Sequence, residues 1–157
     1  MTDQTDTPAA ALHVSGLEKS YRLGSEAIPV LQGLDLRVDR GDMIAIMGPS
    51  GSGKTTLLNC VAAIDTPDGG SVYIAGTAVD YGSERARTLL RRRDIGIVFQ
   101  FFNLIPTLSV RENIALPQQI AGGARGETND RVDGLIERVG LGKRRDHLPH
   151  QLSGGEM

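Results

Sequence analysis

The residues with the clearest chemical meaning are eight consecutive positions, 48–55, which read Gly-Pro-Ser-Gly-Ser-Gly-Lys-Thr. This is the complete G-x-x-x-x-G-K-[ST] pattern of a phosphate-binding loop. Its glycines allow backbone conformations that turn successive N–H groups inward, onto the oxygens of a polyphosphate. The lysine adds a positive charge, and the final hydroxyl is a suitable ligand for Mg²⁺. The pattern therefore predicts a site for a magnesium-bound nucleotide.

The flanking residues predict the elements that such a loop needs. An apolar run at 43–47 indicates a strand before the loop, and apolar residues recur at helical spacing after it. We expect a helix over residues 54–64, whose N-terminal N–H groups and partial positive charge favour an anion. The alternative is a glycine-rich turn that happens to contain a lysine. The strand and the helix around the motif favour the phosphate loop.

The rest of the first hundred residues reads mainly as strands. Alternating apolar residues predict two half-buried antiparallel strands, one around residues 12–14 and one over 34–38. A third strand is expected around residues 72–74. Residues 83–93 are expected to form a charged helix, which leads into an apolar strand over 95–99.

The remaining residues read as helical. Ser109 and Glu112 have the spacing of a capping box, so we expect a helix from Val110 that Pro117 kinks or ends. Between residues 132 and 139 apolar side chains recur every three or four positions. This spacing predicts an amphipathic helix closed by Gly140.

Composition sets outer bounds on what the chain can be. Its 157 residues suit one domain, and a net charge of −2 argues against a dedicated nucleic-acid binder. Residues 1–10 are polar and acidic, so we expect a disordered tail rather than a secretory signal, and no stretch of 18 apolar residues could span a bilayer. These features indicate a cytoplasmic protein. The single Cys60 is expected to be a small buried apolar residue rather than a redox group.

Two further motifs follow the phosphate loop in a fixed order. Gln100 comes directly after the apolar run at 95–99, and residues 152–156 read Leu-Ser-Gly-Gly-Glu. With the phosphate loop, this combination resembles the ATP-binding subunits of ABC transporters over residues 12–157. The resemblance implies an α/β P-loop NTPase cassette fold. An N-terminal antiparallel β subdomain with the phosphate-loop core would cover residues 11–100, and a helical signature subdomain would cover 101–157. The C-terminal part of the core sheet would be missing.

The resemblance also assigns roles to individual residues. It implies that ATP is held by Tyr21, Gly48, Pro49, Ser50, Gly51, Ser52, Gly53, Lys54, Thr55 and Thr56. Tyr21 would stack on adenine, although a tyrosine merely packed at a strand end is the alternative. Lys54 and Gln100 would act in catalysis, and Thr55 and Gln100 would bind Mg²⁺. The alternative for Gln100 is an exposed loop glutamine.

The Leu-Ser-Gly-Gly-Glu segment is the family's signature. The resemblance implies that Ser153, Gly154 and Gly155 contact the ATP of an opposite subunit, either a second copy or a paired ATP-binding subunit. Two half-sites that face different nucleotides require such a head-to-tail pair. The alternative is an ordinary helix cap, because Ser153 and Glu156 also have that spacing.

Residues 101–114 and 24–31 resemble the branch of lipoprotein-releasing, macrolide-export and cell-division cassette ATPases. This implies a transmembrane permease as partner, at the inner face of the cell membrane. Two readings stay open for the apolar residues 101–105, which either dock the permease or form core. A non-transport ATPase that acts mechanically, as in cell division, is the alternative function. A P-loop kinase or GTPase is disfavoured by the signature.

The sequence also departs from the family pattern. Family members continue beyond the signature into a helix, a strand ending in Asp-Glu, an Asp-bearing loop and a histidine, and none of these is in this sequence. We therefore expect a truncated chain. Without the general base, turnover is expected to fall by about 10²–10⁴, while nucleotide binding is retained.

Overall fold

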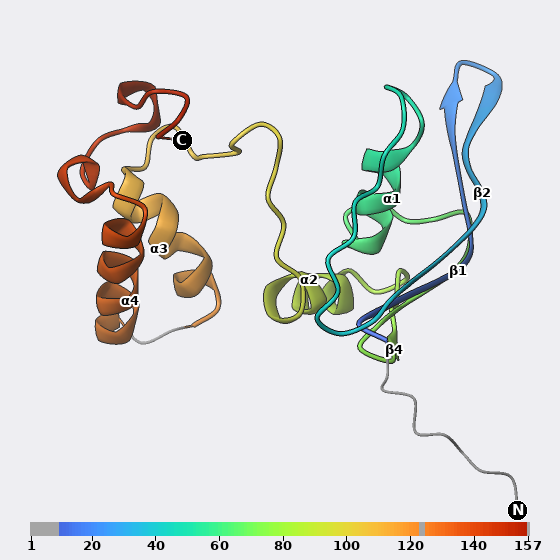
Figure 1. Cartoon of the computed structure of the whole chain (residues 1–157), viewed down its shortest axis with the longest axis horizontal. Helices are drawn as coiled ribbons and strands as arrows, with labels where there is room; N and C mark the ends of the chain where they lie inside the picture. The colour runs from blue at the N-terminus through green and yellow to red at the C-terminus, as the bar shows by residue number, and fades with distance from the viewer. Residues whose placement is uncertain (1–9, 123–124, 157) are drawn as a thin grey trace, which may run out of the picture. The chain divides into compact units, whose positions relative to one another are not determined.

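The computed structural model describes residues 10–122 and 125–156, which belong to two compact units divided between Gly96 and Ile97. The first unit holds the sheet with helices α1 and α2, and the second holds α3 and α4 (Figure 1). Each unit has its own buried core. Of the predicted disordered tail, residues 1–9 lie outside the described residues, and Ala10 is buried.

Within residues 10–96 the elements are β1 (Leu12–Leu23), β2 (Glu26–Val38), α1 (Lys54–Val61), β3 (Gly69–Ile74), β4 (Thr77–Ala78) and α2 (Glu84–Arg93). The strands form an antiparallel sheet in the order β2-β1-β3-β4. Val14 of β1 lies opposite Leu36 on one side and Val72 on the other. The strands predicted around residues 12–14, 34–38 and 72–74 are therefore confirmed, as is the helix predicted over 83–93.

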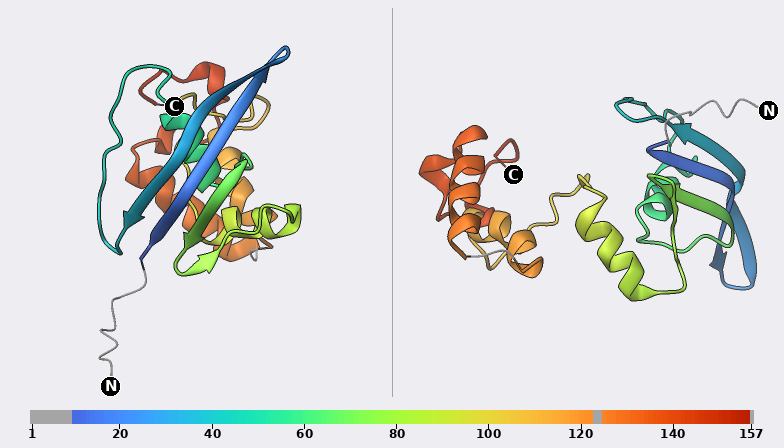
Figure 2. Two further views of the ribbon diagram at one scale, coloured as in Figure 1. Left: turned by 90° about the vertical axis from the view of Figure 1, so that its right-hand side faces the viewer. Right: turned by 90° about the horizontal axis from the view of Figure 1, so that it is seen from below.

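One face of the sheet and one face of α1 form the core of the first unit (Figure 2). Its buried residues are Val14, Leu17, Leu31, Leu57, Cys60 and Val72. Strict alternation would place Val14 and Leu17 on opposite faces of β1. The pairing with β2 shifts register between them, at Gly16 with φ of +56°, so both side chains reach the core.

The helix after the phosphate loop is shorter than predicted, because it ends at Val61 rather than at residue 64. Ala63 adopts a left-handed backbone with φ of +52°. Its N–H donates to Cys60 O at 2.9 Å, and Ile64 N–H donates to Asn59 O at 2.9 Å. These two bonds form a Schellman motif, which satisfies the last carbonyls of α1. The sequence does not predict this early end of the helix, because the left-handed position is usually occupied by glycine and here it is an alanine.

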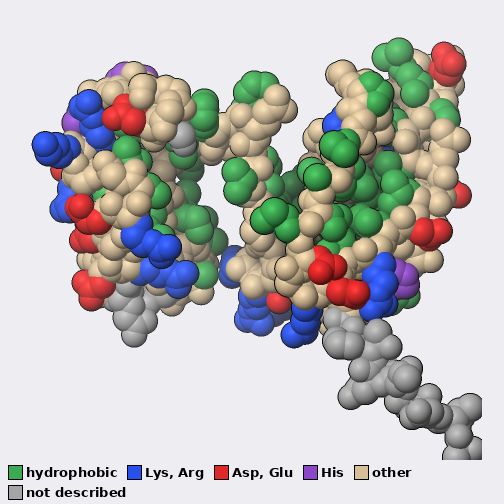
Figure 3. Space-filling view, viewed as in Figure 1, with side chains coloured by type: hydrophobic (Ala, Val, Ile, Leu, Met, Phe, Trp, Pro, Cys, Tyr) green, Lys and Arg blue, Asp and Glu red, His purple; other side chains and the backbone are tan. Residues whose placement is uncertain are grey.

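The strands predicted over residues 43–47 and 95–99 are not formed. Among the described residues neither segment pairs with a strand, and all of their residues except the half-buried Ile95 are exposed, reaching 97% for Met43 and 99% for Val98. An apolar run becomes a strand only where a neighbour completes the hydrogen-bond ladder, and a buried parallel strand needs cover on both faces. Hydrophobic side chains consequently gather on the visible face of the first unit (Figure 3).

The second unit contains α3 (Val110–Ile120), α4 (Arg125–Arg138) and two short 3₁₀ turns, η1 (Gly142–Arg144) and η2 (Pro149–Gln151). The capping box is confirmed: Glu112 N–H donates to Ser109 Oγ, and Ser109 N–H donates to the Glu112 carboxylate. Pro117 does not end the helix, which continues to Ile120. The last predicted helix also forms, beginning earlier than expected, and Gly140 follows it with φ of +74°.

The α3–α4 pair has a small core of Val110, Ala115, Val132 and Ile136. Arg111 Nε and Asp133 Oδ1 lie 3.1 Å apart and join the two helices at the core's edge. None of the helices in the described ranges has the length and apolarity that a bilayer crossing requires.

Deep burial of Ile136 makes the second unit sensitive to this residue. Ile136→Ala should lower the free energy of unfolding of that unit by about 2–4 kcal/mol, through lost transfer energy and a cavity. Val139→Ala, in the turn directly after α4, removes a side chain from a residue that is 63% exposed, and should change the free energy of unfolding by less than about 0.5 kcal/mol. Urea unfolding followed by far-UV circular dichroism measures both. Equal losses would contradict the assigned core.

Candidate functional site: a phosphate-binding loop

The predicted phosphate loop connects the irregular segment 43–47 to α1. Gly51 and Gly53 have φ of +80° and +87°, a left-handed conformation that side chains disfavour. A Cβ at Gly53 would also lie 3.0 Å from Val30 Cγ1 and 3.2 Å from Val30 O. Glycine at this position therefore lets the loop lie directly against β2.

The side chain of Lys54 folds back over the loop. Its ammonium donates to Gly48 O at 2.8 Å, to Pro49 O at 2.7 Å and to Ser52 Oγ at 3.3 Å. A Cβ at Gly48 would lie 2.7 Å from the same Ser52 hydroxyl, so a side chain there would displace the Ser52 side chain. The loop thus curls around a positive charge, which is the arrangement that an incoming polyphosphate needs.

The N-terminus of α1 has free hydrogen-bonding capacity. Gly53 is its N-cap, so no side chain caps the helix, and its first turn holds no acidic residue. The first helical bond runs from Leu57 N–H to Gly53 O at 2.9 Å, so the N–H groups of residues 54–56 precede it. Thr55 is exposed at this end. Its hydroxyl suits Mg²⁺, which takes few protein ligands besides substrate phosphates.

Tyr21 reaches the same helix from β1. Its side chain is 41% exposed, and its hydroxyl donates to Asp65 Oδ2 at 2.8 Å. A side-chain hydrogen bond with Thr56 lowers the pKa of Tyr21, but burial and the Asp65 carboxylate outweigh this effect, so the pKa is raised overall. The phenol therefore stays protonated. The structure brings Tyr21 and the first turn of α1 together through Thr56.

Gln100 lies in the second unit, where it is exposed and follows an irregular segment rather than a strand. The phosphate loop belongs to the first unit. The predicted roles of Gln100 in catalysis and in Mg²⁺ binding therefore stay predictions.

The signature segment forms a turn over residues 154–156. Ser153 N–H and Oγ donate to Glu156 Oε2 at 2.9 Å and 2.8 Å, and Arg144 Nε donates to Glu156 Oε1 at 3.3 Å. The bonds from the Ser153 backbone and hydroxyl lower the pKa of Glu156, so its carboxylate is ionised. A Cβ at Gly154 or Gly155 would meet open space. These contacts are compatible both with a helix cap and with the predicted contact to nucleotide.

Comparison with known proteins gives the family. The sequence matches the ABC transporter family over residues 31–157. The chain belongs to the ABC transporter family. It is 47% identical over 147 residues to the lipoprotein-releasing system ATP-binding protein LolD of Pseudomonas syringae, covering 94% of this chain and 65% of that protein. It is 44% identical over 150 residues to LolD 1 of Rhodospirillum rubrum, covering 96% and 66%.

A solved cassette has the same fold. The dimeric structure of the ATP-binding cassette MJ0796, in a post-hydrolysis state bound to ADP and Pi, superimposes with a TM-score of 0.85 at 38% identity. The match covers 92% of this chain and 64% of that one. This confirms the predicted α/β cassette fold with an antiparallel β part and a helical part. The chain spans about two thirds of the length of these ABC relatives.

Sequence reasoning missed the polar partners of Tyr21 in this ABC cassette. Lys19 and Tyr21 are two residues apart on β1 and so share a face, and this spacing could have predicted that their side chains are neighbours. Asp65 lies 44 residues beyond Tyr21, in the turn after α1, and no local pattern connects it to either side chain. Asp65 comes close to Lys19 and Tyr21 only in the folded chain, where the turn after α1 lies against β1.

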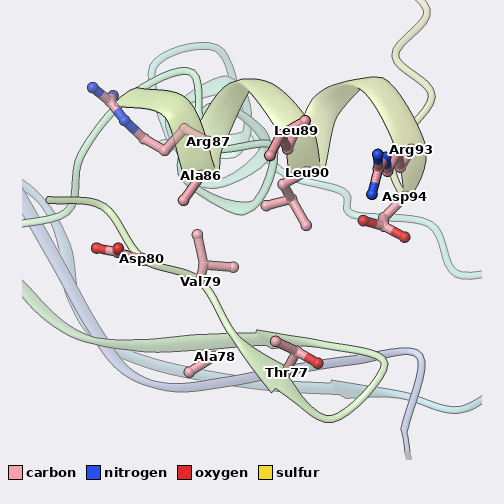
Figure 4. Close-up of a pocket in the computed structure, with 10 residues that line it drawn as sticks. All are labelled: Thr77, Ala78, Val79, Asp80, Ala86, Arg87, Leu89, Leu90, Arg93 and Asp94. Atoms are coloured by element: carbon pink, nitrogen blue, oxygen red, sulfur yellow. The ribbon is translucent and has the colours of Figure 1, made fainter. Parts of the chain in front are cut away.

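A separate hollow of about 230 Å³ lies between β4 and α2 (Figure 4). Val79 and Leu90 face each other across its apolar middle, with Asp80 and Arg87 at one end and Arg93 at the other. None of the predicted site residues lines it. The hollow is therefore distinct from the phosphate loop.

Cys60 lies on the buried face of α1, as the sequence predicted. Burial raises its pKa to about 11, so the neutral thiol dominates at pH 8. Its reaction with a disulfide reagent such as DTNB should therefore be at least about a hundredfold slower than in the unfolded chain, where the ordinary pKa applies. Released thionitrobenzoate measures this rate with and without denaturant. Equal rates would contradict the burial of the thiol.

Proposed function

We propose that this chain is the ATP-binding part of an ABC transporter of the lipoprotein-releasing type. The observation that carries the proposal is the loop at 48–55, which curls around the Lys54 ammonium at an uncapped helix N-terminus. The relatives at 44–47% identity support the transport class, because their names describe lipoprotein-releasing systems.

The proposed binding mode assigns each part of the loop a task. The backbone N–H groups of the glycine-rich loop and of the first turn of α1 hold the phosphates. The Lys54 ammonium gives up its hydrogen bonds to the loop carbonyls and donates to phosphate oxygens instead. Tyr21 stacks on the base. Thr55 and Gln100 would hold Mg²⁺, and the ion would supply positive charge beside the phosphates. We propose that the same assembly hydrolyses ATP, with Gln100 orienting the attacking water.

The proposed assembly is a dimer of ATP-binding subunits. The solved relative MJ0796 is dimeric, and Ser153, Gly154 and Gly155 would contact the nucleotide of the opposite subunit. When the two subunits close on ATP, their movement would change the conformation of a transmembrane permease. The chain would then lie on the cytoplasmic face of the membrane.

Lys54 provides the decisive test. Lys54→Ala should weaken Mg-ATP binding by about 10–100-fold, because charge-assisted hydrogen bonds to phosphate are lost. Isothermal titration calorimetry measures the affinity. Arg92→Ala, on the exposed face of α2 in the same unit, is the matched loss of one positive charge and should leave the affinity unchanged. If both variants bind like the parent, or the parent does not bind Mg-ATP, the proposal is wrong.

A further inference from the structure

A polar cluster joins β1 to the turn that follows α1. Among the described residues Lys19 is the only charged side chain that is buried. Its ammonium lies 2.9 Å from Asp65 Oδ1, 2.6 Å from Thr66 O and 3.9 Å from Asp68 Oδ1. A buried ammonium is costly unless several acceptors surround it, so these contacts hold the turn against the strand.

Asp65 stands at the centre of this cluster and serves two elements. Its Oδ1 accepts from Lys19, its Oδ2 accepts from the Tyr21 hydroxyl at 2.8 Å, and its N–H donates to Asn59 O of α1 at 3.1 Å. Burial raises the pKa of Asp65, but the bonds from Lys19, Tyr21 and the Thr66 N–H outweigh it, so the pKa is lowered and the group is ionised. The carboxylate therefore links the end of α1 to the tyrosine.

The turn itself is fastened to β1 on both sides of Lys19. Asp68 N–H donates to Glu18 O at 2.8 Å, and Ser20 N–H donates to Asp68 Oδ2 at 2.6 Å. Asp65 is consequently presented to Tyr21 from a fixed backbone. A hydrogen bond to an ionised carboxylate in such a position restricts the tyrosine ring to a narrow range of orientations.

The Tyr21 ring is constrained from a second direction. The Lys19 ammonium lies 5.2 Å from the ring centroid, within the range of a cation–π contact. Because the hydroxyl already donates its hydrogen bond to Asp65, it has no proton left to donate to a ligand. What the side chain can offer a nucleotide is its aromatic face.

We propose that Asp65 is a positioning residue for the nucleotide base, which fixes the Tyr21 ring through its hydroxyl so that the ring face is ready to stack. This rests on the proposed function, which assigns Tyr21 to the base. It adds that recognition of the base depends on an acidic side chain that touches neither base nor phosphate. The same contact makes the start and the end of α1 parts of one site, since the phosphates bind at the start and Asp65 follows the end.

Two variants and their combination test the proposal by calorimetry with Mg-ATP and with inorganic tripolyphosphate. In Asp65→Asn the single amide oxygen should go to the charged Lys19, so the phenol loses its acceptor. Tyr21→Phe removes the hydroxyl and leaves the Lys19 network untouched. Each variant should weaken Mg-ATP binding about three- to fivefold, and the double variant by the same factor, because both remove the bond between the Tyr21 hydroxyl and Asp65. Affinity for tripolyphosphate, which has no base, should not change.

Asp68→Asn is the matched control. It removes the same charge from the same turn, beside the same lysine, but its amide oxygen can still accept from Ser20 N–H and the residue does not contact the phenol. Mg-ATP affinity should therefore stay at the parent value. If Asp65→Asn weakens the binding of tripolyphosphate as much as the binding of Mg-ATP, the proposal is overturned, because Asp65 would then support the phosphate loop as a whole. Losses that multiply in the double variant would also overturn it.

The positioning role of Asp65 and the proposed function can be tested separately. If the parent binds Mg-ATP in a Lys54-dependent way and Tyr21→Phe and Asp65→Asn bind equally well, only the positioning role is wrong. If the parent shows no Lys54-dependent binding, the proposed function fails and the positioning role fails with it.

Discussion

The structure depends on one electrostatic arrangement: an ammonium held by the carbonyls of a tight loop at the uncapped start of a helix. Lys54 contacts Gly48 O and Pro49 O while the N–H groups of the first turn of α1 have no side-chain cap. Such a loop gathers positive charge and unpaired donors at one place, which is unfavourable unless an anion is to be bound there. The surrounding elements hold α1 and the loop in position.

The sheet holds α1 at three places. Gly53 lies against Val30 at its start, Leu57 and Cys60 enter the core along its length, and the Lys19–Asp65 pair holds the turn at its end. Burying the middle of a helix fixes its rotation, and anchoring both ends fixes its translation. The antiparallel sheet is thus the platform that aims the helix N-terminus, and it carries Tyr21 beside that N-terminus.

The parts predicted correctly from sequence are those governed by local signals. The glycine turn that leads into α1, the capping box at Ser109 and the alternating strands around Val14 and Leu36 each depend on residues close in the chain. The segments 43–47 and 95–99 were predicted as strands because apolar runs suit strands, but pairing is a property of two segments and neither has a partner among the described residues. Asp65 could not be predicted, because its contacts join residues 44 and 46 positions apart. Family membership gives the fold and the class of protein, whereas the contacts of individual side chains come from the geometry of this chain.

The central claim is that residues 48–55 recognise a chain of phosphates rather than a nucleoside. Calorimetric titration of the purified protein with ATP, ADP and AMP, each with magnesium, tests it most directly. Affinity should fall as phosphates are removed, with AMP binding at least about a hundredfold more weakly than ATP, because charge-assisted contacts to the β- and γ-phosphates supply most of the binding energy. AMP binding as tightly as ATP would contradict the account.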